Sequence, residues 1–302
     1  MRETSKIVAR LIDTFVKNYN TRGDIWGIDI PTWQLECGEK PSENAGSLVL
    51  ATKEITIRAV KEAIFEFLLK EELDILDSEI LASDEFRKFV ENRLDRNLEP
   101  YLTTIRNLEK LVRLHDTLAF SYANFSLAPE LLYFDPNIHK SLIKPVLEEI
   151  KALPGNEIFV YDPLEYYALK PYEKFIEKKV GYALEVLNNK TSVAEKFVVK
   201  EPCLLTRKFG FDLRRTIERL LDNLIFHPLS GNLTVCCGEF MWFVAPKIAF
   251  NNAREILRML SHYSRRILVI CPSAAFLFKI AKLFDDELKG IEIRDLLDIL
   301  AR

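Results

Sequence analysis

The chain has little of several patterns that define common protein classes. Its 302 residues carry a net charge of −3, so no basic field points to nucleic acid. The longest strongly apolar run, residues 267–278, contains Pro272 and is too short to cross a bilayer. No glycine-rich phosphate-binding motif occurs, which argues against nucleotide chemistry. Five cysteines in a chain of this length do not form a disulfide framework, so we expect metal or redox use in a reducing cytoplasm.

Glycine and proline are also scarce over much of the first half. No glycine occurs between Gly46 and Gly155, and apolar residues recur at helical spacing over residues 57–68 and 86–94, so this stretch is predicted to be largely helical. The N-terminal residues 7–16 show the same spacing with charges between, which predicts an amphipathic helix and not a signal peptide.

Four of the five cysteines are clustered late in the chain. Cys203 lies 33 positions before Cys236, and Cys271 lies 34 positions after Cys237. The three sites follow short apolar runs at residues 197–199, 233–235 and 267–270, which read as strands of a mostly parallel sheet. Because the carboxyl ends of such strands meet at one edge, the thiols are predicted to form a metal or cluster site.

The adjacent pair Cys236-Cys237 bears on the choice of metal. Neighbouring cysteines do not easily reach one tetrahedral ion together, whereas they can bind different irons of one cluster. An iron–sulfur cluster is therefore favoured over zinc, with buried small hydrophobic cysteines as a third interpretation. Pro272 after Cys271, and Pro202 before Cys203, suit a strand that gives way to a helix, whose amino terminus lowers the pKa of a thiol.

A local repeat favours an α/β fold with two tandem units. Four apolar runs each end in a polar or thiol residue followed by proline, as expected for strand–helix units; the runs are residues 131–134, 158–161, 197–200 and 267–270. Helices are predicted at Asn137–Leu153, Arg214–Leu224, Pro246–His262 and Ala274–Phe284, with the boundary between halves near residues 181–192.

Over residues 195–285 the cysteine pattern resembles the cysteine-rich CCG domain. That family includes the B-type subunit of heterodisulfide reductase and iron–sulfur subunits of glycolate, glycerol-3-phosphate and lactate oxidation systems. Its pattern is one cysteine, thirty-odd residues, CCG, thirty-odd residues, then CxxC. The resemblance implies two tandem Rossmann-like domains with mostly parallel sheets. We expect an N-terminal helical extension at residues 1–45, a degenerate first domain at 46–185, and a second CCG domain at 186–302.

The chain departs from the family pattern in both halves. In the first half, residues 48–52 match the opening strand without its cysteine, and Asp162 and Glu165 stand where Cys-Pro-x-Cys-Tyr has thiols. No counterpart of the CCG and no ferredoxin segment is found. In the second half Ala274 replaces the last cysteine, which leaves four ligands where the family has five. An ordinary [4Fe-4S] cluster, a cluster with an open iron, and a zinc ion all remain open.

The resemblance implies an iron–sulfur redox or electron-transfer subunit whose cluster is held by Cys203, Cys236, Cys237 and Cys271. Implied partners are other redox subunits, either ferredoxin-like proteins, flavoproteins or heterodisulfide reductase-type subunits. An alternative is a non-catalytic scaffold or regulatory subunit with a structural zinc or no metal. A third hypothesis is a thiol–disulfide switch at the vicinal pair. Catalytic residues are not identified.

Other residues carry weaker expectations. Cys37 is interpreted as an ordinary cysteine, and Asp162 and Glu165 as a helix cap, with a hard-metal site involving His139 as the less favoured interpretation. His227 and His262 are predicted to have a surface or capping role, with a fifth cluster ligand as the less favoured interpretation. Arg207 and Lys208 are predicted to be solvated surface residues, with offsetting of cluster charge as the alternative, and Trp242 and Phe243 are predicted to pack in the core.

Overall fold

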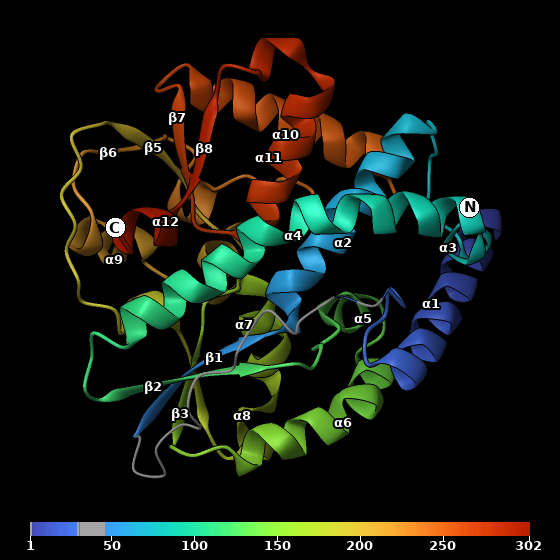
Figure 1. The fold of residues 1–302 in the computed structure, drawn as a ribbon, viewed down its shortest axis with the longest axis horizontal. Helices are drawn as coiled ribbons and strands as arrows, with labels where there is room; N and C mark the ends of the chain where they lie inside the picture. The colour runs from blue at the N-terminus through green and yellow to red at the C-terminus, as the bar shows by residue number, and fades with distance from the viewer. Residues whose placement is uncertain (1, 29, 31–45) are drawn as a thin grey trace.

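The computed structural model describes residues 2–28, 30 and 46–302, which form an α/β fold built on two parallel sheets of four strands each (Figure 1). The strands of the first sheet are β1 (Ser47–Thr52), β2 (Leu118–Ala123), β3 (Glu157–Val160) and β4 (Lys179–Tyr182). Those of the second are β5 (Phe197–Lys200), β6 (Leu224–Phe226), β7 (Arg266–Val269) and β8 (Glu292–Asp295). The predicted fold class is confirmed.

The two sheets have the same topology. Their strand orders are β2-β1-β3-β4 and β6-β5-β7-β8, with every neighbouring pair parallel. The first strand of each half is thus central, flanked by the second and third strands. The first sheet lies within residues 46–185 and the second within 186–302, so each half of the predicted division holds one complete sheet.

Helices surround and separate the sheets. In chain order they are α1 (Arg2–Arg22), α2 (Lys53–Lys70), α3 (Ser78–Ala82), α4 (Asp84–Val112), α5 (Pro129–Phe134), α6 (Pro136–Ala152), α7 (Pro163–Leu169), α8 (Glu173–Ile176), α9 (Leu213–Leu220), α10 (Pro246–Ser261), α11 (Pro272–Phe284) and α12 (Leu296–Leu300). Short 3-10 or π turns occupy Lys170–Tyr172, Ala183–Glu185, Leu204–Lys208, Gly231–Leu233 and Asp286–Leu288. Helices α2 and α4 pack on each other between the two sheets (Figure 1).

Helix α2 is the element that joins the halves. It is buried along nearly its whole length, and it packs on α4 of its own half and on α10 and α11 of the other. Its Phe65 lies 6.1 Å from the ring of Trp242 and 6.4 Å from that of Phe276. Trp242 and Phe243 are fully buried, as predicted, and the hydrophobic core runs through both halves.

Two predicted strands are wrong. Residues 131–134 belong to helix α5, because Pro129 stands at its first position and Asp135 then caps α6. Residues 233–235 before the CCG form no strand; Leu233 and Val235 are 66% and 36% exposed, so no sheet buries this run. The second strand of that half is instead β6. The helix predicted over Arg214–Leu224 is α9, which ends four residues early at Leu220, and β6 begins at Leu224.

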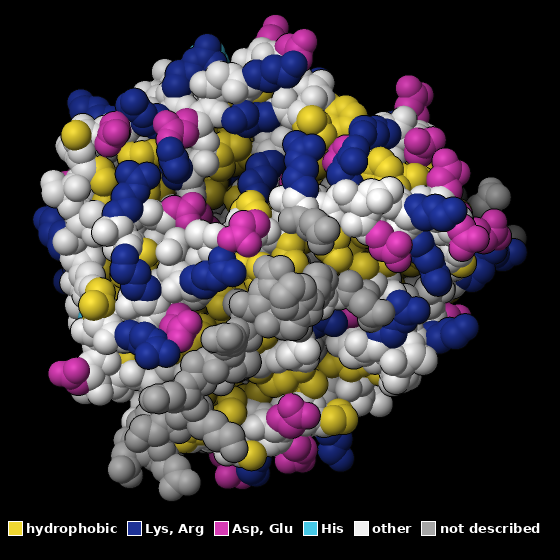
Figure 2. All heavy atoms as spheres, viewed as in Figure 1, with side chains coloured by type: hydrophobic (Ala, Val, Ile, Leu, Met, Phe, Trp, Pro, Cys, Tyr) yellow, Lys and Arg dark blue, Asp and Glu magenta, His cyan; other side chains and the backbone are white. Residues whose placement is uncertain are grey.

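The proline-initiated helices agree well with the predictions. Helices α6, α10 and α11 each have proline at an early position and end within two residues of the predicted bounds. No helix among the described residues is long and apolar enough to cross a membrane. On the face seen in Figure 2, basic and acidic side chains are interspersed, and no single-sign field covers it.

Candidate thiol site

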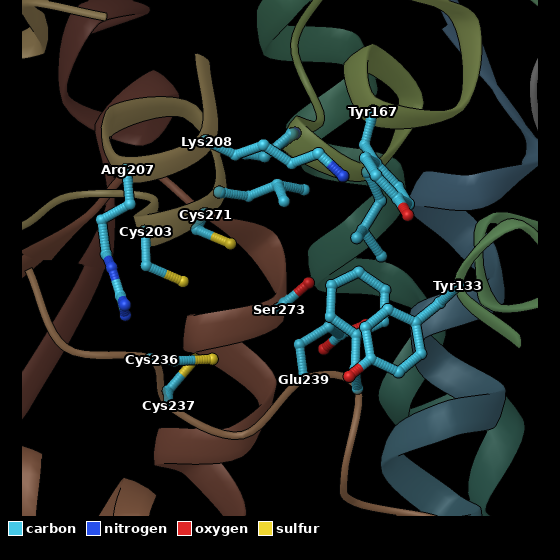
Figure 3. Close-up of a pocket in the computed structure, with 14 residues that line it drawn as sticks. Tyr133, Tyr167, Cys203, Arg207, Lys208, Cys236, Cys237, Glu239, Cys271 and Ser273 are labelled. Carbon is cyan, nitrogen blue, oxygen red and sulfur yellow. The ribbon is translucent and has the colours of Figure 1, made fainter. Parts of the chain in front are cut away.

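The four clustered cysteines line one pocket of about 520 Å³ (Figure 3). Cys203 follows β5, the pair Cys236-Cys237 lies in the loop after β6, and Cys271 follows β7. The facing wall comes from the first half, from α5 after β2 and from α7 after β3. The pocket therefore lies where the carboxyl edges of the two sheets face each other, which is where ligands bind in such sheets.

Local structure places the two outer cysteines at the starts of helical turns. Cys203 precedes the π turn Leu204–Lys208, and Cys271 is the N-cap residue of α11, directly before Pro272. Both therefore lie in the predicted setting of a strand giving way to a helix.

Gly238 fixes the turn that presents the cysteine pair. Its φ of +106° is one that residues with a Cβ rarely adopt, and a Cβ there would lie 2.9 Å from the Cα of Ala249. The Gly238 N–H donates a hydrogen bond of 3.4 Å to the Cys236 sulfur. Glycine therefore lets the loop pass close to α10 while an amide points at the thiol.

Cys236 is the thiol best prepared as a thiolate. The Cys203 thiol donates a hydrogen bond to the Cys236 sulfur, and this bond with the Gly238 amide lowers the pKa of Cys236 to about 5. The same hydrogen bond and burial raise the pKa of Cys203 well above its usual value. The two thiols are therefore coupled, and the surroundings favour the thiolate form at Cys236.

Of the other two thiols, Cys237 is buried and Cys271 is partly buried, and both favour the protonated form. Burial raises the pKa of Cys237 and of Cys271, and it outweighs the helix amino terminus that was expected to lower the latter. Two buried cations oppose this effect: Lys200 acts on Cys237 and Arg58 acts on Cys271. Because metal ligation removes thiol protons, these cations favour the ligating form.

A buried network of charges lies beneath the pocket. Arg58 of α2 binds the Asp162 carboxylate, donates to the Ser273 hydroxyl at 2.8 Å, and lies 3.7 Å from Glu239. Lys61, one turn further along α2, pairs with Glu130 and lies 3.4 Å from Glu239. Since Glu239 and Ser273 line the pocket, α2 of the first half supplies the positive charge under the thiols of the second.

Sequence reasoning missed Arg58, Lys61, Lys200 and Glu239. A signal existed for two of them, because Arg58 and Lys61 are three residues apart and so share one face of a helix whose other face is apolar. Lys200 and Glu239 gave none, since a charge at the end of a strand or after a turn is ordinarily solvated. Arg207 and Lys208 have exposed side chains, as predicted, and both also line the pocket.

The carboxylates of the first half form a helix cap, as predicted. Asp162 accepts from the Leu164 amide at 2.8 Å, and Glu165 accepts from the Asp162 amide, which together make a capping box. His139 lies elsewhere: one ring nitrogen contacts the Tyr172 hydroxyl at 2.9 Å and the other the Leu127 carbonyl at 2.8 Å. The hard-metal interpretation of these three residues is therefore not supported.

The remaining histidines do not complete the thiol site. His227 is not at the surface but buried; its ring accepts from the Leu229 amide at 2.9 Å and packs on Tyr263. His262 ends α10 and is exposed, as predicted. Neither lines the pocket. Cys37 lies outside the described residues.

Among the described residues no three histidine, cysteine or carboxylate side chains close around a point that would hold a single metal ion. The four thiols line one pocket, and cysteine thiolates are the usual ligands of iron–sulfur clusters. Ala274, at the position of the fifth cysteine, is buried in the first turn of α11. Neither the protein-family models nor the curated proteins give any match to this chain.

Proposed function

We propose that this protein is an iron–sulfur redox subunit whose cluster is held by Cys203, Cys236, Cys237 and Cys271. The observation that carries the proposal is that four thiols, brought by three loops, line one pocket where two parallel sheets face each other. Cysteine thiolates are the usual ligands of iron–sulfur clusters. A bound cluster would supply one-electron exchange at this pocket.

The surrounding residues suit a site that stores negative charge. Lys200 and Arg58 offset the charge of thiolates, and the Gly238 amide donates to a ligand sulfur. Charge and hydrogen bonds to sulfur are the means by which a protein sets the potential of a cluster. In this proposal the chain works in a reducing cytoplasm and exchanges electrons with a partner protein, a ferredoxin-like protein, a flavoprotein or a heterodisulfide reductase-type subunit.

Metal and sulfide analysis tests the proposal. The protein is purified without oxygen, and iron, zinc and acid-labile sulfide are measured with the absorption spectrum. We expect iron and sulfide in the unmodified chain, their loss in Cys236→Ala, and their retention in Cys37→Ala, which removes the remaining cysteine. Zinc alone, or no metal in any sample, would overturn the proposal and leave the scaffold alternative.

The Cys203–Cys236 hydrogen bond favours a second candidate, a thiol–disulfide switch. Here Cys236 as thiolate would attack a disulfide oxidant, and Cys203 would then displace the second thiol, so that two thiols give up two electrons and two protons. The disulfide in this candidate would join Cys203 and Cys236, because the hydrogen bond joins these two, and not the vicinal pair Cys236-Cys237. Oxidised glutathione added to metal-free protein, followed by peptide mapping, tests it: a Cys203–Cys236 disulfide supports the switch, and unreacted thiols reject it.

A further inference from the structure

The wall opposite the thiols is aromatic, and the proposed function makes no use of it. Tyr133 and Phe240 stack with ring centroids 4.6 Å apart and planes 8° from parallel. Tyr167 meets Phe240 edge-on at 5.8 Å. All three rings line the pocket, and Tyr133 is 55% exposed (Figure 3). An exposed tyrosine stacked at a pocket mouth offers a flat surface on which a planar ligand can pack.

Glu239 lies between this wall and the thiols and has an unused acceptor. Arg58 and Lys61 approach its Oε1, at 3.7 and 3.4 Å. Its Oε2 is buried and has no hydrogen-bond partner among the described residues. The whole residue is 6% exposed. A buried carboxylate oxygen without a donor is costly, so a ligand N–H in the pocket would complete it.

The mouth of the pocket is positively charged. Arg207 and Lys208 line it with exposed side chains, and the Lys208 Nζ lies 4.2 Å from the centroid of the Tyr167 ring. No carboxylate pairs with either cation in the part of the chain that the structure describes. An anionic group on a ligand would therefore meet unpaired positive charge as it enters.

We propose that this pocket binds a small, flat aromatic anion that carries an N–H donor. Its ring lies along Tyr133 and Phe240, its N–H donates to the Oε2 of Glu239, and its anionic group lies toward Lys208. The pocket volume of about 520 Å³ is in the range of small-molecule sites. The inference rests on the aromatic wall, Glu239 and the two cations and gives the thiols no role, so metal analysis and ligand binding can fail separately.

Three related probes test the components of the ligand. Indole-3-acetate has the ring, the N–H and the anion; 1-methylindole-3-acetate lacks only the N–H, and 3-methylindole lacks the anion. Affinities are measured by calorimetry on the full chain as isolated. We expect indole-3-acetate to bind most tightly, with a loss of about tenfold on N-methylation because Glu239 is then left unpaired. Removing the donor from the probe leaves the contacts of Glu239 with Arg58 and Lys61 undisturbed.

Two surface variants test the protein side. Tyr133→Ala removes the stacking platform and is expected to weaken indole-3-acetate about fivefold or more. Tyr263→Ala is its matched control, since Tyr263 is 46% exposed and packs on His227, away from the pocket. Lys208→Gln is expected to weaken the two anionic probes but not 3-methylindole. Lys190→Gln is its control and is expected to weaken none, since Lys190 is exposed and does not line the pocket.

The outcomes are decisive in either direction. Saturable binding of indole-3-acetate, weakened by N-methylation and by Tyr133→Ala, supports the inference. Equal affinity for all three probes, no saturable binding of any, or equal effects of Tyr133→Ala and Tyr263→Ala would overturn it.

Discussion

Asp162 and Cys271 occupy the same position in the two halves of the protein. Each stands two residues beyond the last residue of its strand that pairs with the central strand, at Val160 opposite Leu50 and at Val269 opposite Lys200. Each is the N-cap of a helix that begins with proline. Arg58 binds the carboxylate of Asp162, and its charge also opposes the raised pKa of Cys271. One buried guanidinium thus acts on both members of the pair.

Replacing Arg58 should be severely destabilising. Arg58→Met leaves the carboxylates of Asp162 and Glu239 buried with less compensation, and removing one partner of a buried ion pair costs about 3–5 kcal/mol. We expect that loss in the free energy of unfolding measured with urea. Adding Asp162→Asn, which keeps an N-cap side chain, should recover part of it.

A surface ion pair provides the control for Arg58. Arg106 pairs with Glu99 at 2.7 Å, with both side chains about half exposed. Arg106→Met should change the free energy of unfolding by less than about 1 kcal/mol, because exposed pairs contribute little. Equal costs for Arg58→Met and Arg106→Met would show that the buried network does not join the halves energetically.

The CCG glycine should be irreplaceable for a steric reason. Gly238→Ala adds a Cβ 2.9 Å from the Ala249 backbone at a φ of +106°, so we expect a loss of stability of about 3 kcal/mol or more. Gly231→Ala is the matched control, because Gly231 also has positive φ, +57°, but has open space around its Cβ position. Its cost should be near 1 kcal/mol, since αL strain alone remains. Thermal unfolding of both variants measures the difference.

The hydrogen bond from Cys203 should control the reactivity of Cys236. In metal-free protein Cys236 has a pKa of about 5 and is alkylated as a thiolate above that pH. Cys203→Ala removes the donor, so the pKa rises and alkylation at pH 6 should slow by about tenfold or more. Iodoacetamide rates at Cys236, followed by peptide mass spectrometry, provide the measurement.

Cys271→Ala is the comparison for that experiment. It removes another thiol of the same pocket, and no hydrogen bond joins Cys271 to Cys236 in the structure. The rate at Cys236 should therefore stay close to that of the unmodified protein. If both variants slow alkylation alike, general disturbance of the pocket is the cause and the assigned hydrogen bond is wrong.

His139 should make stability depend on pH. Burial lowers its pKa from 6.5 to about 4, and this effect outweighs the hydrogen bond with the Leu127 carbonyl, which raises the pKa. The unfolded chain then binds more protons between pH 6.5 and 4, so stability present above pH 6.5 is lost as the pH falls, by up to about 3 kcal/mol. His139→Gln should lack this loss. The difference in free energy of unfolding between the variant and the unmodified protein should therefore become smaller as the pH falls. For His262→Gln, at an exposed site, this difference should not change with pH.

The sequence predicted the elements that depend on local signals. Proline at the first helical turn placed α6, α10 and α11, and the run Phe197–Lys200 gave β5 with its bounds as observed. Parallel strands with thiols at their ends then predicted that distant cysteines meet, and they line one pocket. Each of these inferences needs only periodicity, caps and the geometry of a parallel sheet.

What was missed depends on contacts between residues that are far apart in the sequence or on the order of strands in the sheet. Leu233 to Val235 has the composition of a strand, but β6 already fills the edge position beside β5, so this run stays outside the sheet. Arg58 and Lys61 gave little sign of burial because their partners, Glu239 and Glu130, are about 180 and 70 positions away. Local pattern does not show which charges will be paired with residues distant in the sequence.

Because α2 packs on both halves, the pKa of a thiol in the second half depends on how the first half packs against it. The charge that acts on Cys271 comes from a side chain more than two hundred positions earlier, held by a helix that packs on both halves. A shift of α2 relative to the second half would move Arg58 and so change the electrostatic potential at Cys271, without any contact with the thiol. The reactivity of Cys271 should therefore change when the relative position of the two halves changes.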